Sequence, residues 1–213
     1  MKFDELLKLL GNEPLFSTAT LLAGDVDPKD IQRQLSRWTK AGRVSMLRRG
    51  LYALATPYRK VEPHPYLIAN RLWRASYVSC QAALAHYGMI PEAVYAPTSV
   101  TTGRPEVIHN SFGRFIARHI HPKLFFGYRL VDLGRGQEAF VALPEKALLD
   151  LVHLEPGGDE PAFLRELRLQ NLEELDLGRL NDMAVLMMKP KLMRAAGNIA
   201  RMARELAMET ESL

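Results

Sequence analysis

The 213-residue chain has little cysteine and lacks long apolar runs, and both absences limit its class. Its single cysteine, Cys80, excludes an internal disulfide framework and a multi-thiolate zinc site. No apolar run approaches the roughly 20 residues that a membrane-spanning helix requires. The start, MKFDELLKLLGNE, places acids among its leucines and lacks the cleavage site of a signal peptide. We therefore expect a soluble, cytoplasmic protein with no membrane partner.

Motifs that carry catalysis or cofactor binding are also missing. The sequence has neither a Gly-rich phosphate loop nor a convincing Ser/His/Asp constellation. Asp132, Glu138 and Glu145 do not form a recognisable magnesium-binding pattern. We predict no catalytic residue, no cofactor and no metal site, so the protein is not expected to be an enzyme. The enzymatic alternative is a nuclease or nucleotidyltransferase tethered to DNA.

Charge is unevenly distributed along the chain, although the net charge is only +4. Between Asp27 and Lys60, nine basic residues oppose two acids, whereas between Gln137 and Asp176 ten acids oppose three basic residues. A positive surface attracts phosphates at long range, so the first segment favours a nucleic-acid partner. The acidic segment is expected to face water or a cationic partner.

The first sixty residues carry the signals of three helices and a hairpin. Apolar periodicity predicts helices over 3–10, 18–24 and 28–41. Asp27 is expected to cap the third helix, with Pro28 at its first position. Two short runs, 44–50 and 51–55, predict a hairpin with Arg48 and Arg49 at its tip. This layout predicts a winged helix-turn-helix DNA-binding domain over residues 1–60.

The remainder, residues 61–213, is predicted to be a separate α+β domain. Three prolines in the segment TPYRKVEPHP disfavour regular structure and place the boundary there. Ser79 is expected to cap a helix over 80–87. The other expected helices and strands, in chain order, are helix 65–75, strands 94–102, 114–120, 128–133 and 138–144, and helices 144–154, 161–169, 177–188 and from Pro190 onward. The chain is thus predicted to be α+β, with a small sheet and a helical tail in its second domain.

The helix over 28–41 gives the sharpest functional signal. At 100° per residue, Ile31, Leu35 and Trp38 share one face. The opposite face is basic and polar, and comprises Lys29, Gln32, Arg33, Ser36, Arg37 and Lys40. No acid follows Asp30, so the helix forgoes the i,i+4 ion pairs of ordinary surface helices.

This polar face suits the major groove of DNA, which admits one α-helix. The predicted base-reading residues are Lys29, Gln32, Arg33 and Ser36. Arg37 and Lys40 are expected to contact flanking phosphates, and Arg48 and Arg49 to contact the DNA backbone or the minor groove. The predicted partner is therefore double-stranded DNA.

A second basic cluster lies between Gly103 and Arg135. Arg114 and Arg118 are four residues apart, so they share one face if they lie on a strand. With Arg104 they form a possible second basic surface, for more DNA or for a polyanionic partner. The alternative is an ordinary solvated face of a sheet.

Four segments resemble one known family. LRRGLYAL at 47–54, YVSCQAALAHYGMIPEAVY at 77–95, TSVTTGRP at 98–105 and PEKALLDLVHL at 144–154 are similar, in this order and spacing, to the AbiE-type antitoxins. These are transcriptional regulators of type IV toxin–antitoxin, or abortive-infection, systems used in phage defence.

The resemblance implies a protein with two duties. Its N-terminal winged helix represses its own operon by binding inverted repeats in the operator. Its C-terminal domain counteracts a nucleotidyltransferase-like toxin encoded alongside, and direct contact with that toxin is left open. The resemblance implies that the DNA-contacting residues are Lys29, Arg33, Arg37, Arg48 and Arg49. The alternative is a stand-alone winged-helix regulator without a toxin partner.

Overall fold

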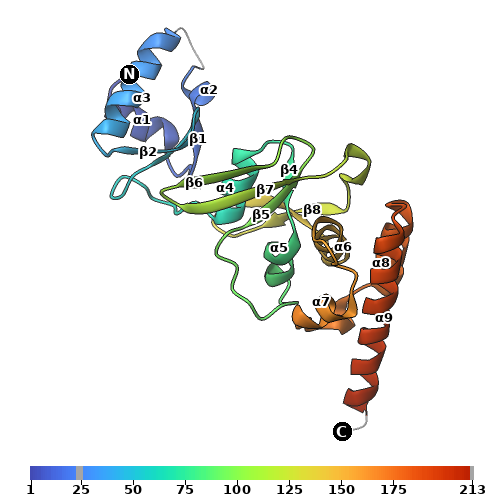
Figure 1. Ribbon diagram of the computed structural model, residues 1–213. Helices are drawn as coiled ribbons and strands as arrows, with labels where there is room; N and C mark the ends of the chain where they lie inside the picture. Colours follow the sequence, from blue (N-terminus) through green and yellow to red (C-terminus); the bar gives the residue numbers. More distant parts are fainter. Residues whose placement is uncertain (23–25, 212–213) are drawn as a thin grey trace.

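The structure, a computed structural model, describes residues 1–22 and 26–211 and contains two separate sheets (Figure 1). A three-stranded antiparallel sheet near the N-terminus has the order β1-β3-β2, and a six-stranded mixed sheet has the order β6-β7-β5-β4-β9-β8. The predicted α+β class is confirmed. Within the described residues, no helix combines the length and apolarity needed to cross a bilayer.

The N-terminal part follows the predicted succession of helices and hairpin. Its elements are α1 (Phe3–Leu10), β1 (Phe16–Ser17), α2 (Thr18–Leu21), α3 (Pro28–Lys40), β2 (Val44–Arg48) and β3 (Leu51–Leu54). The helix predicted over 18–24 ends earlier, at Leu21, and its expected last residues, 23 and 24, lie outside the described residues. The two-residue strand β1, which pairs with β3, was not predicted.

Local sequence explains where α3 begins and ends. The carboxylate of Asp27 accepts a hydrogen bond from the backbone N–H of Lys29 at 2.9 Å, and Pro28 occupies the first turn. Both features were predicted, because a cap satisfies a free N–H and Pro lacks one. Gly42 adopts a φ of +67° directly after α3, a conformation that glycine tolerates without strain, and β2 follows.

The second part contains a larger sheet than predicted. Its elements are α4 (Pro65–Leu72), β4 (Ser76–Val78), α5 (Cys80–His86), β5 (Thr98–Thr101), β6 (Glu106–Asn110), β7 (Gly113–His119), β8 (Tyr128–Asp132), β9 (Glu138–Ala142), α6 (Pro144–Leu154), α7 (Pro161–Glu166), α8 (Leu177–Leu186) and α9 (Pro190–Glu211), with short 3₁₀ turns at Pro122–Leu124 and Leu172–Glu174. Strands β4 and β6 were not predicted. All three residues of β4 are buried and β6 is a largely exposed edge strand, so neither shows the alternation that marks a half-buried strand.

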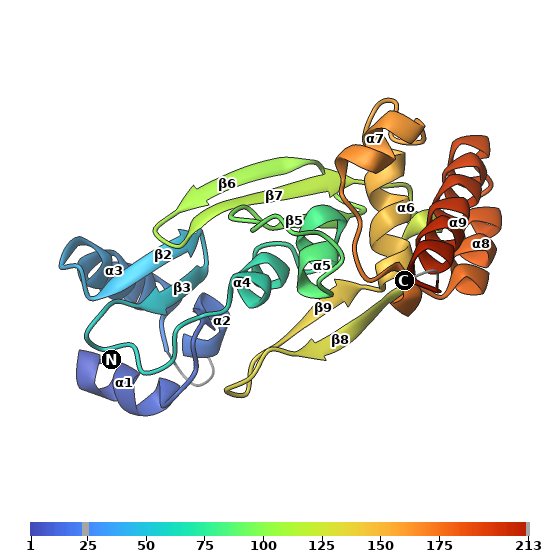
Figure 2. The same cartoon turned by 90° about the horizontal axis from the view of Figure 1, so that it is seen from below.

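Buried residues form two clusters that do not follow the predicted boundary at residue 60. The smaller cluster joins α1, α3 and the three-stranded sheet, and the larger one lies around the six-stranded sheet and helices α5, α6, α8 and α9. Leu15, Leu47 and Leu51 belong to the larger cluster although they precede residue 60. The β2–β3 hairpin lies beside the β6–β7 hairpin (Figure 2), where Asn110 donates to the carbonyl of Leu47 at 3.4 Å. Residues 55–64 form no helix or strand, and their assignment as a domain boundary stays a prediction.

A network of charged and polar side chains lies buried between β4 and α6. Lys146 and Asp150 form an i,i+4 ion pair on α6, and both side chains are fully buried. Asp150 also accepts hydrogen bonds from the hydroxyls of Tyr77, at 2.9 Å, and Ser79, at 2.8 Å. The ammonium of Lys146 donates to the Tyr77 oxygen at 2.8 Å. Burial, followed by the nearby Asp150 carboxylate, raises the pKa of Tyr77, so this hydroxyl keeps its proton.

This network corrects one sequence-based expectation. Ser79 precedes α5, but its hydroxyl makes no capping bond to that helix and donates to Asp150 instead. Two acids of the acidic segment, Asp150 and Glu145, are buried rather than facing water, and their cationic partners, Lys146 and Arg179, belong to the same chain. Each buried charge has a specific partner, as the cost of burying an isolated charge requires.

Removing one member of the buried ion pair should destabilise the protein strongly. Asp150→Ala leaves the Lys146 ammonium buried without its counter-charge, and we expect a loss of about 3–5 kcal/mol. The Lys146→Met/Asp150→Leu double variant buries no charge and should lose less than the single variant. Urea denaturation followed by circular dichroism measures both. Arg33→Ala, which breaks an exposed pair with Asp30, is the control and should change stability by less than about 1 kcal/mol. Equal losses for the single and double variants would contradict this account.

His64 ties the connecting segment to α4 and to the sheet. Its Nδ1 accepts a hydrogen bond from the N–H of Tyr66 at 3.1 Å, which caps α4. The backbone N–H of His64 donates to the side-chain oxygen of Gln137, between β8 and β9, at 2.8 Å. Burial, together with the nearby His86, lowers the pKa of His64.

This lowered pKa predicts a loss of stability on acidification. Below about pH 6.5 the unfolded chain binds a proton at this histidine more readily than the folded chain, so stability falls as the pH falls. His64→Asn retains a capping side chain but does not titrate there, so stability should decline less between pH 8 and pH 5.5. Urea midpoints at the two pH values give the comparison. Because burial also lowers the pKa values of His86 and His153, part of the decline should persist. An equal decline in the variant and the wild type would count against a role for His64.

Candidate nucleic-acid interface

Helix α3 is oriented by its apolar side. Ile31, Leu35 and Trp38 are buried in the smaller cluster, and the Trp38 ring contacts that of Phe3 with 5.6 Å between centroids. The six predicted polar residues on the opposite side of the helix are all exposed: Lys29, Gln32, Arg33, Ser36, Arg37 and Lys40. The predicted division of this helix into a buried and an exposed face is confirmed.

One ion pair on this face was not expected. Arg33 lies 3.2 Å from the carboxylate of Asp30, one turn earlier. Both side chains are more than half exposed, and such surface pairs contribute little energy, so the pair leaves Arg33 accessible to an anion. Within the described residues, Lys29, Arg37 and Lys40 make no ion pair.

The β2–β3 hairpin contributes to the same surface through Arg49. A groove of about 590 Å³ between α2, α3 and the hairpin is lined by Gln32, Ser36, Lys40 and Arg49, among others. A second depression, of about 500 Å³, lies along α3 itself and is lined by Lys29, Gln32, Arg33, Ser36 and Arg37. The carbonyl of Gly50 accepts the N–H of Thr18 at 3.0 Å, which holds the hairpin tip against the start of α2.

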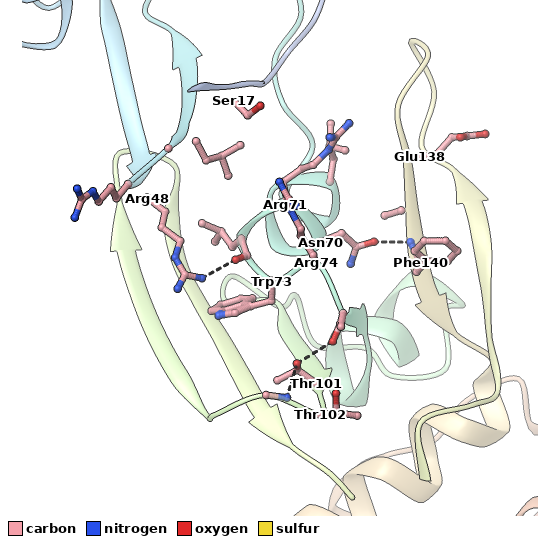
Figure 3. A pocket seen from close by; sticks show the side chains of 18 of the residues that line it. Ser17, Arg48, Asn70, Arg71, Trp73, Arg74, Thr101, Thr102, Glu138 and Phe140 are labelled. Atoms are coloured by element: carbon pink, nitrogen blue, oxygen red, sulfur yellow. Dashed lines mark hydrogen bonds between the residues drawn. The ribbon is translucent and has the colours of Figure 1, made fainter. Parts of the chain in front are cut away.

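Arg48 does not share this surface, contrary to the sequence-based expectation. Its guanidinium donates to the carbonyl of Leu72 at 2.7 Å (Figure 3). It also lies 3.6 Å from the carboxylate of Glu106. The same carboxylate accepts a hydrogen bond from the indole N–H of Trp73 at 2.9 Å. Arg48 therefore joins the hairpin to the second part of the chain.

Of the three arginines predicted to form a second basic surface, one is engaged in contacts within the protein and two are exposed. Arg118 donates to the carbonyl of Leu154, at 2.8 Å, and to Glu155, at 2.9 Å, at the end of α6. This arrangement suits a helix C-terminus, where unpaired carbonyls favour a cation. Arg104 and Arg114 are exposed, Arg114 on β7 and Arg104 in the loop before β6.

A cleft of larger volume, which the sequence did not predict, lies between the β2–β3 hairpin, α4 and the β8–β9 hairpin. It has a volume of about 910 Å³, and its lining includes Arg49, Asn70, Arg71, Arg74 and Phe140. A sequence signal for it exists only in part: Arg71 and Arg74 are three residues apart at the end of a predicted helix, but the opposite wall comes from residues about seventy positions later. Within the described part of the chain, no group of three or more His, Cys, Asp or Glu side chains is arranged to hold a metal ion.

Comparisons with known proteins give a distant structural likeness. Neither a family model nor a curated protein matches the chain. Among solved structures, the chain is similar to the crystal structure of the Rv2827c protein from Mycobacterium tuberculosis, with a TM-score of 0.54 and 16% sequence identity. The match covers 93% of this chain and 78% of the other. At this level of identity the likeness concerns the fold alone.

Proposed function

We propose that the chain is a DNA-binding regulator in which residues 1–60 form a winged helix-turn-helix. In this proposal α3 is the recognition helix and the β2–β3 hairpin is the wing. The order α1-β1-α2-α3-β2-β3 and the sheet order β1-β3-β2 support the assignment. The proposed partner is double-stranded operator DNA, with the inverted repeats that the resemblance to the AbiE-type antitoxins implies.

The exposed polar face of α3 is the observation that carries the proposal. The helix is fixed by Ile31, Leu35 and Trp38, so its lysines and arginines are held outward. Lys29, Gln32, Arg33 and Ser36 are assigned to base edges, and Arg37, Lys40 and Arg49 to phosphates. These residue types match the donors that the major groove and the DNA backbone select.

The neighbouring arginines of the hairpin allow a matched test. Arg49→Ala should weaken binding to a fragment of the protein's own promoter and reduce the log–log salt slope by about 0.9, the value for one phosphate contact. Arg48→Ala removes the same charge one residue away, but Leu72 and Glu106 already hold that guanidinium, so its slope should remain that of the wild type. Fluorescence anisotropy at several salt concentrations measures both. If Arg48→Ala lowers the slope and Arg49→Ala does not, the assigned interface is wrong.

We further propose that the protein is an AbiE-type antitoxin, acting in the cytoplasm on a nucleotidyltransferase-like toxin encoded beside it. The four similar segments support this. Segment 77–95 contains Tyr77 and Ser79, and segment 144–154 contains Lys146 and Asp150. These four side chains form the buried network, so the two segments meet in the core of the second part. This part is assigned the antitoxin duty, with no catalytic role.

Growth rescue separates the two proposed duties. We expect the full-length protein to restore growth of cells that express the neighbouring nucleotidyltransferase-like gene. The Arg33→Ala/Arg37→Ala variant should restore growth equally while losing repression of a promoter reporter, because these residues serve DNA binding only. Point variants are used because Leu15, Leu47 and Leu51 are buried in the larger cluster, so removing residues 1–60 would expose the core.

The alternative regulator predicts a different result. A stand-alone winged-helix regulator would repress the reporter but would not rescue growth under any toxin dose. That outcome would contradict the antitoxin proposal and leave the DNA-binding proposal in place.

A further inference from the structure

The cleft between the hairpin, α4 and the β8–β9 hairpin has the dimensions of a small-molecule site. Its volume of about 910 Å³ lies within the usual range of ligand pockets, roughly 300–1,000 Å³. Figure 3 shows the labelled Arg71 and Arg74 between the Arg48 side and the strand that carries Glu138 and Phe140. Elements from both parts of the chain line it, so an occupant would contact both.

One side of this cleft is cationic and lacks counter-charges. Arg49, Arg71 and Arg74 all line it and are exposed. Within the described residues none of the three has an ion pair or a side-chain hydrogen bond, in contrast to Arg48 nearby. The charged residues that line the cleft are Arg48, Arg49, Arg71, Arg74 and Glu138, so its net charge is positive although one acid is present. A positive cleft concentrates anions, and the planar guanidinium group matches phosphate geometry.

The other side of the cleft is mainly apolar, although Glu138 also lines it. The side chains of Leu130 and Phe140 are about half exposed there, 50% and 43% respectively. Asn70 accepts the N–H of Phe140 at 2.6 Å, so its amide is fixed with the oxygen already used. Its Nδ2 is buried, so it is not exposed to an occupant of the cleft.

We propose that this cleft binds a nucleotide. The phosphates contact Arg71 and Arg74, and the base lies against Phe140 and Leu130. Inorganic phosphate alone would leave the apolar side uncovered. A DNA duplex presents phosphates outward and its bases are stacked inside, so it would leave Phe140 and Leu130 in contact with water.

Arg49 links this cleft to the proposed DNA surface. It lines both the cleft and the groove between α3 and the hairpin. A nucleotide phosphate that engages Arg49 therefore competes with a DNA phosphate for the same guanidinium. This consequence rests on the proposed function: nucleotide binding lowers affinity for the operator, and DNA lowers affinity for the nucleotide by the same factor.

Isothermal titration of the full-length protein with ATP, GTP and tripolyphosphate tests the site. Arg71→Ala/Arg74→Ala should lower nucleotide affinity at least about tenfold, because each lost arginine removes a charge-assisted hydrogen bond. Lys123→Ala/Lys189→Ala removes two exposed charges outside the cleft and should bind nucleotide like the wild type. Phe140→Ala should weaken ATP and GTP binding but leave tripolyphosphate binding unchanged. Thermal unfolding of each variant confirms that it is folded.

Three results would overturn the proposal. In the first, the wild-type protein binds neither ATP nor GTP at millimolar concentration. In the second, the Arg71→Ala/Arg74→Ala variant binds nucleotide with the affinity of the wild type. In the third, Phe140→Ala binds ATP and GTP with the affinity of the wild type, which would indicate a site for phosphate only. Duplex binding by Arg71→Ala/Arg74→Ala is measured alongside: weakened duplex binding without nucleotide binding would assign these arginines to the DNA surface. If the protein binds no DNA at all, the titrations still decide the nucleotide proposal on their own.

Discussion

Burial of the apolar side of α3 is the constraint on which the rest of the surface depends. Ile31, Leu35 and Trp38 lie in the smaller cluster, and the Trp38–Phe3 ring contact ties the helix to α1. A helix fixed on one side has no rotational freedom, so its polar residues are presented in a set order. Rotating the helix toward another face would expose a tryptophan and two large aliphatic side chains, at about 1.5–3 kcal/mol for each aliphatic residue. The exposed charges are therefore a consequence of the apolar packing beneath them.

The sequence predicted α3 well because every signal for it is local. Asp27, Pro28 and the 3.6-residue apolar period lie within the helix or beside it, and they determined both its start and its two faces. Arg48 and Arg49 show what local sequence cannot predict, which is the contacts that each side chain makes with distant residues. They are adjacent, identical and both exposed to some degree, yet one is held by Leu72 and Glu106 and the other lines the groove beside α3. The partners of Arg48 are 24 and 58 positions away, so no window around the hairpin distinguishes the two.

The same reason explains the other differences in the second part. Ser79 has the position and chemistry of a helix cap, and only the approach of Asp150, 71 residues later, shows that its hydroxyl is used elsewhere. Strand β4 is short and entirely buried, so its pattern resembles a connecting segment until β5 and β9 are placed beside it. The sequence did not predict the cleft because its arginines come from the β2–β3 turn, from α4 and from the residues after α4, whereas its apolar side comes from β8 and β9. In each case the missing information was which residues, distant in the sequence, lie next to one another in the fold.

The hairpin is the element through which the two parts of the molecule affect each other. Arg48 anchors it to α4 and β6, while the Gly50 carbonyl anchors it to the start of α2, beside α3. Coupling between two sites requires an element that contacts both and whose contacts differ between the bound states. Arg49 meets the first condition, because it lines both the cleft and the groove beside α3. If the proposed nucleotide and DNA both bind, competition of their phosphates for this guanidinium meets the second condition without any change of fold.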